Sequence, residues 1–381
     1  MKILVTGGAG FIGSNLANAL LHETKKSSQY STEQLKSQRV NRANGTRNEK
    51  RREVIALDDL SLGTPSNLSK EVKFVKGSVM DYDLVLELGK DCDYIFHQAA
   101  LSSSPMFLDD PRKGVDTNVM GFMNIMESAK RNKVKKVIYA SSSSIYNGLP
   151  TPYKESVNVI PKTFYESSFY CREVIAQTYK LEYGVESIGL RYFSVYGPNE
   201  RHKGRFANNI SQFIWDIAEN QKSPIIYGDG TQTRDFTFVD DVVHANILAM
   251  GKRSNRSAGG SDDNDNVKEY WRKNNLGSGF GIYNIGTGTQ TSFNSIVKII
   301  NKWLGTDIRP TYKKNPINNY VQDTLADISL ARLELGYEPK WGNVEDGIKQ
   351  LISQHRSSDS LSTYLSSSSL STSSSYPSIR K

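Results

Sequence analysis

Residues 1–13, with the sequence MKILVTGGAGFIG, decide how the rest of the chain is interpreted. A short apolar strand over Lys2–Thr6 runs directly into the glycine pattern Gly7-x-x-Gly10-x-x-Gly13, and an apolar helix is expected to follow. Glycines at this spacing between a strand and a helix allow a tight turn. They also let the backbone approach a pyrophosphate, which the free N–H groups of the helix can bind. The stretch predicts a dinucleotide-binding unit, and the alternative is a glycine-rich turn that binds nothing.

The acidic residue that should bind the ribose of a dinucleotide is displaced in this sequence. It is expected about 20 residues after the glycines, at the end of the second strand. Asp58, at the end of the second strand Glu53–Asp58, follows Gly13 by 45 residues (58 − 13). Without the 29 residues 24–52 the spacing between Gly13 and Asp58 would be 16 residues (45 − 29). Asp58 is therefore the candidate acceptor for the ribose hydroxyls, and its charge favours NAD over NADP because it repels a 2′-phosphate. Asp59 is the alternative acceptor, and a helix N-cap is the alternative role.

Short apolar strands continue to alternate with helical stretches along the chain. Four more strands are predicted, at Val72–Val75, Tyr94–His97, Lys136–Ala140 and Ser187–Leu190. The segments between them carry apolar residues at helical spacing. This alternation predicts an α/β fold with a Rossmann-type, doubly wound parallel sheet that helices cover on both faces. A smaller α/β unit is expected in the C-terminal part.

Charge and composition restrict the partners of the chain. The net charge of +8 over 381 residues comes mostly from residues 24–52, where nine Lys and Arg outweigh two Glu; the remainder carries +1 (8 − 7). Basic residues scattered through a polar segment are typical of a solvated loop, so we expect no nucleic-acid partner. No apolar run approaches the ~20 residues that cross a bilayer. The apolar part of the N-terminus is too short for a signal peptide, so no secretion is expected.

Cysteine is scarce in this chain. Its two cysteines, Cys92 and Cys171, are too few for a disulfide framework or a cysteine-rich zinc site. We expect a reducing compartment and no bound metal.

Seven motifs occur in the order that is typical of one known family. They are TGGAGFIG at 6–13, HQAA at 97–100, Asn118-x-x-Gly121-x-x-Asn124-x-x-Glu127, ASSSSIY at 140–146, RYFSVYGP at 191–198, GDGTQTRDFTFVDDV at 228–242 and YNIGTGTQTS at 283–292. With them the chain resembles the extended short-chain dehydrogenase/reductase family, specifically its NAD-dependent nucleotide-sugar epimerases and dehydratases. The similarity to UDP-glucose and UDP-glucuronate 4-epimerases is the strongest, and it covers Met1 to about Ile352.

The resemblance implies the cofactor NAD and a set of residues around it. The cofactor-binding residues that it implies are Gly7, Gly10, Phe11, Ile12, Gly13, Asp58, Ser78, Val79, Ala99, Ala100, Asn118, Tyr165, Tyr192 and Phe193. The family normally has Asp where this chain has Ser78.

The resemblance also implies the catalytic and substrate-binding residues. Tyr165 and Ser142 match the catalytic tyrosine and serine, and Ser142, Ser143, Ser194 and Arg234 are the implied substrate-binding residues. Ser194 stands where the family has Asn, and Arg234 matches the arginine that grips the nucleotide diphosphate. The alternatives are a plain strand-end turn for the serine run and a surface ion pair for Arg234.

The residues that follow Ser142 favour one reaction within the family. Dehydratases of the family carry Asp and Glu directly after the catalytic hydroxyl residue, and decarboxylases carry a Glu there. This chain has Ser143 and Ser144 instead. The resemblance therefore implies a UDP-sugar 4-epimerase, with a nucleotide-sugar dehydratase or decarboxylase as the more distant alternative.

One position departs from the family's Tyr-x-x-x-Lys signature. Phe169 stands where the lysine belongs, four residues after Tyr165 and on the same helical face. Without a nearby cation, a tyrosine of pKa ~10 is about 0.1% ionised at pH 7, and reaching the phenolate costs about 4 kcal/mol. Lys162 and Arg172, at i−3 and i+7, are the candidate substitutes. The alternative function is an NAD-binding protein with impaired or lost catalysis that acts as a sensor or a partner subunit.

The expected domain organisation follows the same comparison. We expect an NAD-binding domain over residues 1–193 to which residues 236–251 return, a substrate-binding domain over 194–235 and 280–352, polar insertions at 24–52 and 252–279, and a serine-rich disordered tail at 353–381. The resemblance further implies a UDP-sugar substrate, no membrane partner, a cytoplasmic location and a homodimer.

Overall fold

The structure is a computed structural model that describes residues 1–26, 52–251, 279–315 and 321–354. Most of the predicted insertions 24–52 and 252–279 and of the tail 353–381 therefore lies outside the described residues. At two places the described helices extend into residues that were predicted to belong to an insertion or to the tail. The first helix continues to Lys26, and a helix over residues 344–354 includes the first two residues of the predicted tail.

The main sheet has seven parallel strands. It consists of β1 (Lys2–Thr6), β2 (Glu53–Asp58), β3 (Lys73–Lys76), β4 (Tyr94–His97), β5 (Lys136–Ser142), β6 (Ser187–Tyr192) and β11 (Phe280–Ile285). Their order across the sheet is β11-β6-β5-β4-β1-β2-β3, and each neighbouring pair is parallel. The predicted Rossmann-type fold is confirmed, and the six predicted strands agree with the observed ones to within two residues at either end.

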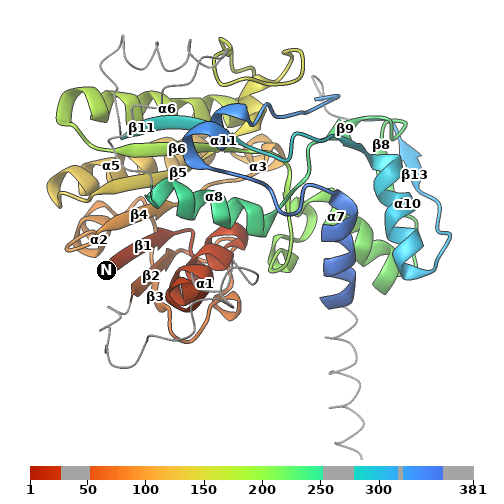
Figure 1. Ribbon diagram of the computed structural model, residues 1–381, viewed down its shortest axis with the longest axis horizontal. Helices are drawn as coiled ribbons and strands as arrows, with labels where there is room; N and C mark the ends of the chain where they lie inside the picture. The colour runs from red at the N-terminus through yellow and green to blue at the C-terminus, as the bar shows by residue number, and fades with distance from the viewer. Residues whose placement is uncertain (27–51, 252–278, 316–320, 355–381) are drawn as a thin grey trace, which may run out of the picture.

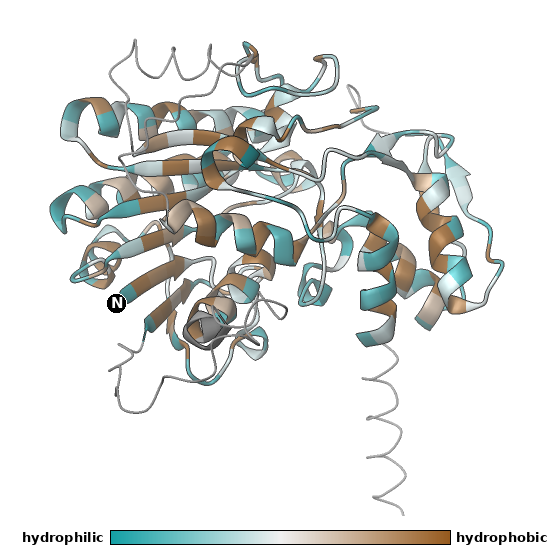
Figure 2. Cartoon of the chain, in the orientation of Figure 1, coloured by the Kyte–Doolittle hydropathy of each residue, from teal (hydrophilic) through white to brown (hydrophobic). Residues whose placement is uncertain are grey.

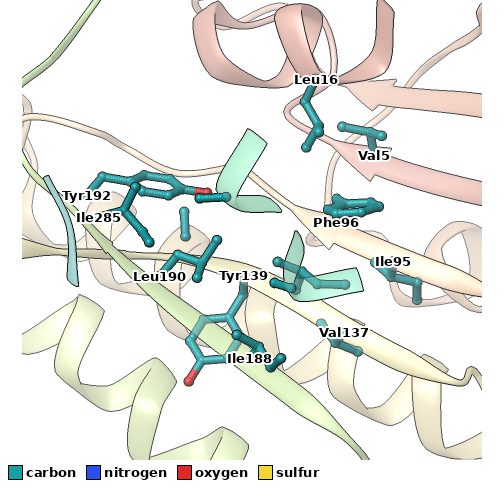
Figure 3. Close-up of a cluster of buried hydrophobic side chains, with 14 of the residues drawn as sticks. Val5, Leu16, Ile95, Phe96, Val137, Tyr139, Ile188, Leu190, Tyr192 and Ile285 are labelled. Carbon is teal, nitrogen blue, oxygen red and sulfur yellow. The ribbon is translucent and has the colours of Figure 1, made fainter. Parts of the chain in front are cut away.

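Helices cover both faces of this sheet (Figure 1). One face carries α1 (Phe11–Lys26), α8 (Val239–Gly251) and α11 (Ser329–Leu335), and the other carries α2 (Tyr82–Leu88), α5 (Gly121–Arg131) and α6 (Phe164–Tyr183). Apolar residues predominate in the middle of the main sheet, and the helices around it carry both apolar and polar residues (Figure 2). Val5 of β1, Phe96 of β4 and Leu16 of α1 lie together in the resulting core, where Val5 and Phe96 are register partners (Figure 3).

A smaller unit lies beside the main sheet, with a core of its own (Figure 1). It contains α7 (Asn209–Ile214), α10 (Phe293–Leu304) and two two-stranded pairs, β8 (Ile225–Tyr227) with β13 (Thr311–Lys313) and β9 (Thr233–Arg234) with β12 (Thr291–Ser292). Aromatic and branched side chains fill its core, among them Phe213, Phe236, Phe293 and Ile296. A third pair, β7 (Val195–Tyr196) with β10 (Thr237–Phe238), follows β6.

Strand β11 belongs to the main sheet although its residues lie in the range 280–352 expected for the substrate-binding unit. Its sequence FGIYNI pairs with β6 from Phe280↔Ser187 to Ile285↔Tyr192, and five of its six residues are buried. An apolar strand of this kind needs cover on both faces, and the main sheet with α6 and α11 supplies that cover.

The strand order locates the place where a ligand can bind. From β1 the chain crosses to β2 and β3 on one side and to β4, β5 and β6 on the other, so the order reverses beside β1. A crevice forms beyond the carboxyl ends of the strands at such a point. None of the helices in the described part of the chain is long and apolar enough to cross a membrane.

Candidate functional site

A cavity of about 1010 Å³ lies where the carboxyl ends of β1, β2, β4 and β5 face the smaller unit. Its wall takes residues from the glycine turn, from the strand ends, from the start of α6 and from β9. The volume is at the upper end of the range of small-molecule sites. The cavity is therefore large enough for an extended ligand and brings most of the predicted site residues together.

The glycine turn forms one end of the cavity. Gly7 has φ +64°, and a Cβ on it would lie 2.6 Å from the backbone nitrogen of Ala99 at the end of β4. A Cβ on Gly13 would overlap with the carbonyl group of Gly7. A Cβ on Gly10 would meet Gly7 O at 3.1 Å and Asp58 Oδ2 at 4.0 Å and nothing else within 4 Å, so it would project into the cavity. The glycines keep this space free at the first residues of α1, where Phe11 and Ile12 line the wall.

Asp58 lies at the end of β2, directly against the glycine turn. Its Oδ2 accepts the N–H of Ala9 at 3.0 Å and its Oδ1 accepts the N–H of Leu60 at 2.8 Å. The next helical turn, η2 (Pro65–Asn67), starts after Thr64, so Asp58 does not cap it. Burial raises the pKa of Asp58, while these backbone donors counteract the rise. Asp59 also lines the cavity but is exposed and bonds Ser61.

Further predicted cofactor-binding residues occupy the wall beside the glycine turn. Ala99 and Ala100 follow β4, Tyr192 ends β6, and Val79 lies beyond β3. The hydroxyl of Tyr192 donates to Gln98 Oε1 at 3.2 Å, which fixes the ring against the end of β4.

Tyr165 and Ser142 meet in the middle of the cavity. Ser142 ends β5 and Tyr165 lies in the first turn of α6, and their hydroxyl oxygens are 3.4 Å apart. The hydroxyl of Ser142 accepts the N–H of Ser144 at 3.2 Å, and the Tyr165 hydroxyl donates to the carbonyl of Ser102 at 3.3 Å. Helix α6 starts here because the side chain of Thr163 caps it by accepting the N–H of Glu166. A serine and a tyrosine thus face the same space from two different elements.

Opposing effects act on the ionisation of Tyr165. Burial, which is the largest effect, raises the pKa of Tyr165, and the charge of Glu166 acts in the same direction. The hydrogen bond with Ser142 and the charge of Arg172 lower the pKa of Tyr165. The tyrosine therefore depends on nearby donors and positive charge to act as a base.

The two cations proposed as substitutes for the missing lysine lie in different places. Phe169 lines the cavity next to Tyr165, as the helical spacing predicts. Lys162 is exposed, its side chain lies beside Gly148, and it forms no part of the cavity wall. Arg172 is fully buried directly behind Phe169.

The other predicted substrate-binding residues also line the cavity. Ser143 follows Ser142, and Ser194 follows β6 with φ +31°. Arg234 of β9 donates to the carbonyls of Gln322 at 2.9 Å and Val321 at 2.7 Å and lies over the ring of Phe293. The Arg234 side chain is also part of the cavity wall.

Three predicted cofactor-binding residues are not part of the cavity wall. Asn118 is fully buried and fixes the segment after β4, because its side chain accepts the N–H of Leu101 at 2.9 Å and donates to Ser168 Oγ at 3.0 Å. Phe193 is fully buried in an aromatic cluster with Tyr146 and Tyr153. The hydroxyl of Ser78 accepts the N–H of Met80. Asn118 and Phe193 thus lie behind the wall, while Ser78 is half-buried between the wall residues Gly77 and Val79.

Several wall residues were not predicted from the sequence. They come from α3 (Ser104–Asp109), α4 (Pro111–Val115), the start of α6 and η5 (Arg201–Phe206), and include Phe107, Lys113, Phe164, His202, Lys203 and Phe206. Short helical turns have no periodic pattern that marks them as part of a site. Within the described residues no group of His, Cys, Asp and Glu side chains is arranged to hold a metal ion.

Comparisons with known proteins agree with this geometry. Residues 3–261 match the model of a family described as the NAD dependent epimerase/dehydratase family. Over 92% of its length the chain is 33% identical to a Methanocaldococcus jannaschii protein named "Putative UDP-glucose 4-epimerase", covering 97% of it. Over 92% of its length it is 30% identical to the UDP-glucuronate 4-epimerase of Thermodesulfobacterium geofontis, covering 94% of it. The crystal structure of the Thermotoga maritima UDP-glucose 4-epimerase with UDP-glucose is similar at 29% identity and a TM-score of 0.76, with 94% of this chain and 99% of that chain covered.

Proposed function

Because the chain belongs to the NAD-dependent epimerase/dehydratase family, we propose that it is an NAD-dependent epimerase that inverts C4 of a UDP-sugar. The observation that carries this proposal is the pair of hydroxyls of Tyr165 and Ser142, 3.4 Å apart, in the same cavity as the glycine turn. The glycine turn of this cavity suits a dinucleotide, and Arg234 lines the same cavity.

The glycine turn and Asp58 would hold the NAD. The turn leaves room for a pyrophosphate beside the N-terminus of α1, and Asp58 places a carboxylate where ribose hydroxyls could donate to it. Ala99, Ala100 and Tyr192 would line the nicotinamide end. When bound, NAD⁺ supplies a two-electron acceptor for the hydride of the sugar C4 and returns the same hydride later.

Tyr165 would move the proton in this reaction. As base it takes the proton of the 4-hydroxyl while the C4–H bond is broken, so that a 4-keto sugar forms. As acid it returns the proton once the keto sugar has turned its other face to the hydride. Ser142 would donate a hydrogen bond to the same sugar oxygen and stabilise its negative charge. Over the full cycle the sugar regains both the hydride and the proton, and only the configuration at C4 changes.

The residues next to Ser142 support an epimerase over a dehydratase. Loss of water from the sugar needs an additional acid and base beside the keto group, and Ser143 and Ser144 offer hydroxyls only. Glu166 does reach the cavity wall, but its carboxylate already accepts from Asn147 Nδ2 at 3.0 Å and from the backbone N–H of Lys162 at 2.6 Å.

The test is direct. The protein is incubated with NAD⁺ and either UDP-glucose or UDP-glucuronate, and the 4-epimer is measured by chromatography. Tyr165→Phe should lower kcat by at least about a hundredfold, since positioned acid–base catalysis contributes at least that much. Ser142→Ala should give a smaller loss. If NAD⁺ binds and no UDP-sugar is converted, the second candidate, a dinucleotide-binding sensor or partner subunit, is favoured, and Phe169 is the observation behind it.

We also propose the domain division, the homodimer and the cytoplasmic location that the resemblance implies. The two separate cores support an NAD-binding unit, in which we include β11 and α11 as well, and a substrate-binding unit. An interface between two copies is supported by exposed apolar side chains on η3 (Asp116–Met120), α5 and α6, namely Met120, Met123, Val174 and Leu181. Sedimentation of the wild type and of Val174→Glu tests the homodimer, which this substitution should dissociate.

A further inference from the structure

We propose that the buried guanidinium of Arg172 supplies the positive charge that Phe169 cannot, and that Arg172 is therefore a positioning residue which favours the ionised form of Tyr165. This inference rests on the proposed function only in so far as it assigns Tyr165 as the base. It concerns a residue that does not line the cavity and whose side chain lies one layer behind it.

Three side chains of α6 form a stack that leads from the cavity into the core. Tyr165, Phe169 and Arg172 follow one another at i, i+4 and i+7 and so share a helical face. The ring of Phe169 meets the ring of Tyr165 edge-on, with centroids 5.1 Å apart at 70°. The guanidinium carbon of Arg172 lies 4.8 Å from the centroid of the Phe169 ring. The ring of Phe169 therefore lies between the tyrosine and the cation.

The guanidinium is held in place by carbonyl groups of three segments. Nε donates to Asn118 O at 2.8 Å, Nη1 to Ala140 O at 3.3 Å, and Nη2 to Ala99 O at 3.0 Å. Ala99 follows β4 at the nicotinamide end of the cavity, and Ala140 lies two residues before Ser142. The charge is thus fixed beneath the two strand ends between which the reaction would take place.

No anion neutralises this charge within the described part of the chain. Arg172 is 0% exposed, and it forms no ion pair with a described carboxylate. The titratable groups that face it are His97 of β4, Tyr139 of β5 and Tyr165 of its own helix. Burial lowers the pKa of Arg172, but a delocalised guanidinium, whose ordinary pKa lies above 12, stays charged over the pH range in which a tyrosine titrates. Burial and Arg172 together keep the pKa of His97 well below its ordinary value, so His97 adds no competing charge.

A purely structural role accounts less well for these observations. A buried charge without a counterion costs several kcal/mol in general, while a neutral amide could also donate to strand-end carbonyls at much lower cost. The cation is also close enough to lower the pKa of Tyr165, against burial and Glu166, which raise it. A role in stabilising the phenolate of Tyr165 therefore explains why a positive charge is kept at Arg172.

The test follows the ionisation of Tyr165 in the full-length protein saturated with NAD⁺. Tyrosinate absorbance is recorded as the pH rises, and subtraction of the Tyr165→Phe curve isolates this tyrosine among the 20 of the chain. In Arg172→Gln we expect Tyr165 to ionise at higher pH than in the wild type. In Arg172→Lys, which keeps a positive charge but not the three hydrogen bonds to carbonyl groups, we expect Tyr165 to ionise near the wild-type pH. Lys162→Gln is the matched control and should leave the curve unchanged.

Unchanged ionisation in Arg172→Gln, or an equal upward shift in Arg172→Lys and Arg172→Gln, would overturn the proposal in favour of a cross-link between strand ends. Melting curves show whether each variant folds. If Arg172→Gln does not fold, Arg172→Lys decides alone: ionisation near the wild-type pH supports the role of the charge, and ionisation at higher pH contradicts it.

Turnover provides a second readout. With UDP-glucose, kcat of Arg172→Gln should fall by about tenfold at neutral pH and recover as the pH rises. A loss that is equal at every pH contradicts the proposal. If the wild type converts no UDP-sugar, the proposed function fails, and the absorbance titration still decides the role of Arg172.

Discussion

At the scale of single residues, the position of Asp58 determines which dinucleotide can bind. Its carboxylate is anchored by the N–H groups of Ala9 and Leu60 and faces the cavity beside the glycine turn. A 2′-phosphate at this place would meet a fixed negative charge that burial has already made costly.

We therefore predict that the wild type binds NAD at least about tenfold more tightly than NADP, a difference of about 1.4 kcal/mol. Asp58→Asn should reduce this ratio toward one, because the amide keeps an acceptor for the backbone but carries no charge. Calorimetric titration with both cofactors measures the ratio. Asp59→Asn is the control, and if it changes the ratio more than Asp58→Asn does, Asp59 is the selecting residue.

At the scale of elements, a buried ion pair fastens α6 to the sheet and thereby positions Tyr165. Glu173 of α6 accepts from Arg191 of β6 through both carboxylate oxygens, at 2.9 and 2.7 Å, and from the hydroxyl of Ser141 at 2.6 Å. Both side chains are about 5% exposed or less. Tyr165 lies two turns away on the same helix, so the bonds of Glu173 to β6 and β5 hold the helix that carries the tyrosine against the sheet.

Glu173→Ala should lower the free energy of unfolding by about 3–5 kcal/mol, because it leaves the guanidinium of Arg191 buried without a counterion. Urea denaturation measures the change. Glu182→Ala, an exposed position near the end of the same helix, is the control and should have an effect within about 0.5 kcal/mol. A small effect of Glu173→Ala would mean that water enters and solvates Arg191.

The segment that leads into α6 carries a carboxyl group whose charge should depend on pH near neutrality. Glu155 lies in the segment before α6, and its Oε1 accepts the N–H of Asn284 in β11 at 2.8 Å. Burial raises the pKa of Glu155 from 4.5 to about 7. Because the pKa of this carboxyl group is higher in the folded than in the unfolded state, its contribution to the free energy of unfolding is fully present below pH ~4.5. That contribution is lost as the pH rises through about 7.

Glu155→Gln should therefore unfold at a higher temperature than the wild type at pH 8 and at nearly the same temperature at pH 4.5. The amide can still accept the N–H of Asn284, and it has no charge to bury. The shift in pKa corresponds to at most about 3 kcal/mol at the upper pH. Melting curves over this pH range test it, and a difference between the two proteins that does not change with pH would contradict it.

At the scale of the whole molecule, residues 24–52 account for most of the net charge and separate the first two strands of the sheet in the sequence. The helix before it ends at Lys26 and the strand after it begins at Glu53, whose N–H donates to the carbonyl of Met1 at 2.9 Å. The glycine turn and all seven strands of the main sheet thus lie in described residues on either side of residues 27–51.

We predict that replacing residues 27–51 by a short Gly/Ser linker leaves the melting temperature and the NAD affinity nearly unchanged, because polar, unpatterned sequence contributes little apolar burial. Calorimetry on the shortened and the full-length chain measures both quantities. A marked drop in either one would show that the segment packs on the sheet or reaches the cofactor.

The sequence by itself determined those features that depend on local patterns. The glycine spacing and the run of apolar strands predicted the Rossmann-type sheet and the place of Asp58 at the carboxyl end of its second strand. The common site of Tyr165 and Ser142 was implied by the resemblance of the motifs to a known family. These features are local because a turn, a strand or a helical face is encoded within a few residues of itself.

Only the tertiary structure decided what depends on packing between distant segments. Helical spacing offered both Lys162 and Arg172 as cations near Tyr165, and burial alone separated them: Lys162 extends into solvent, while carbonyl groups of three distant segments hold Arg172 beneath Phe169. In the same way β11 joined the main sheet, and Asn118 and Phe193 came to lie behind the cavity wall. Side-chain depth follows from the packing of distant segments around a residue, and one stretch of sequence does not encode it.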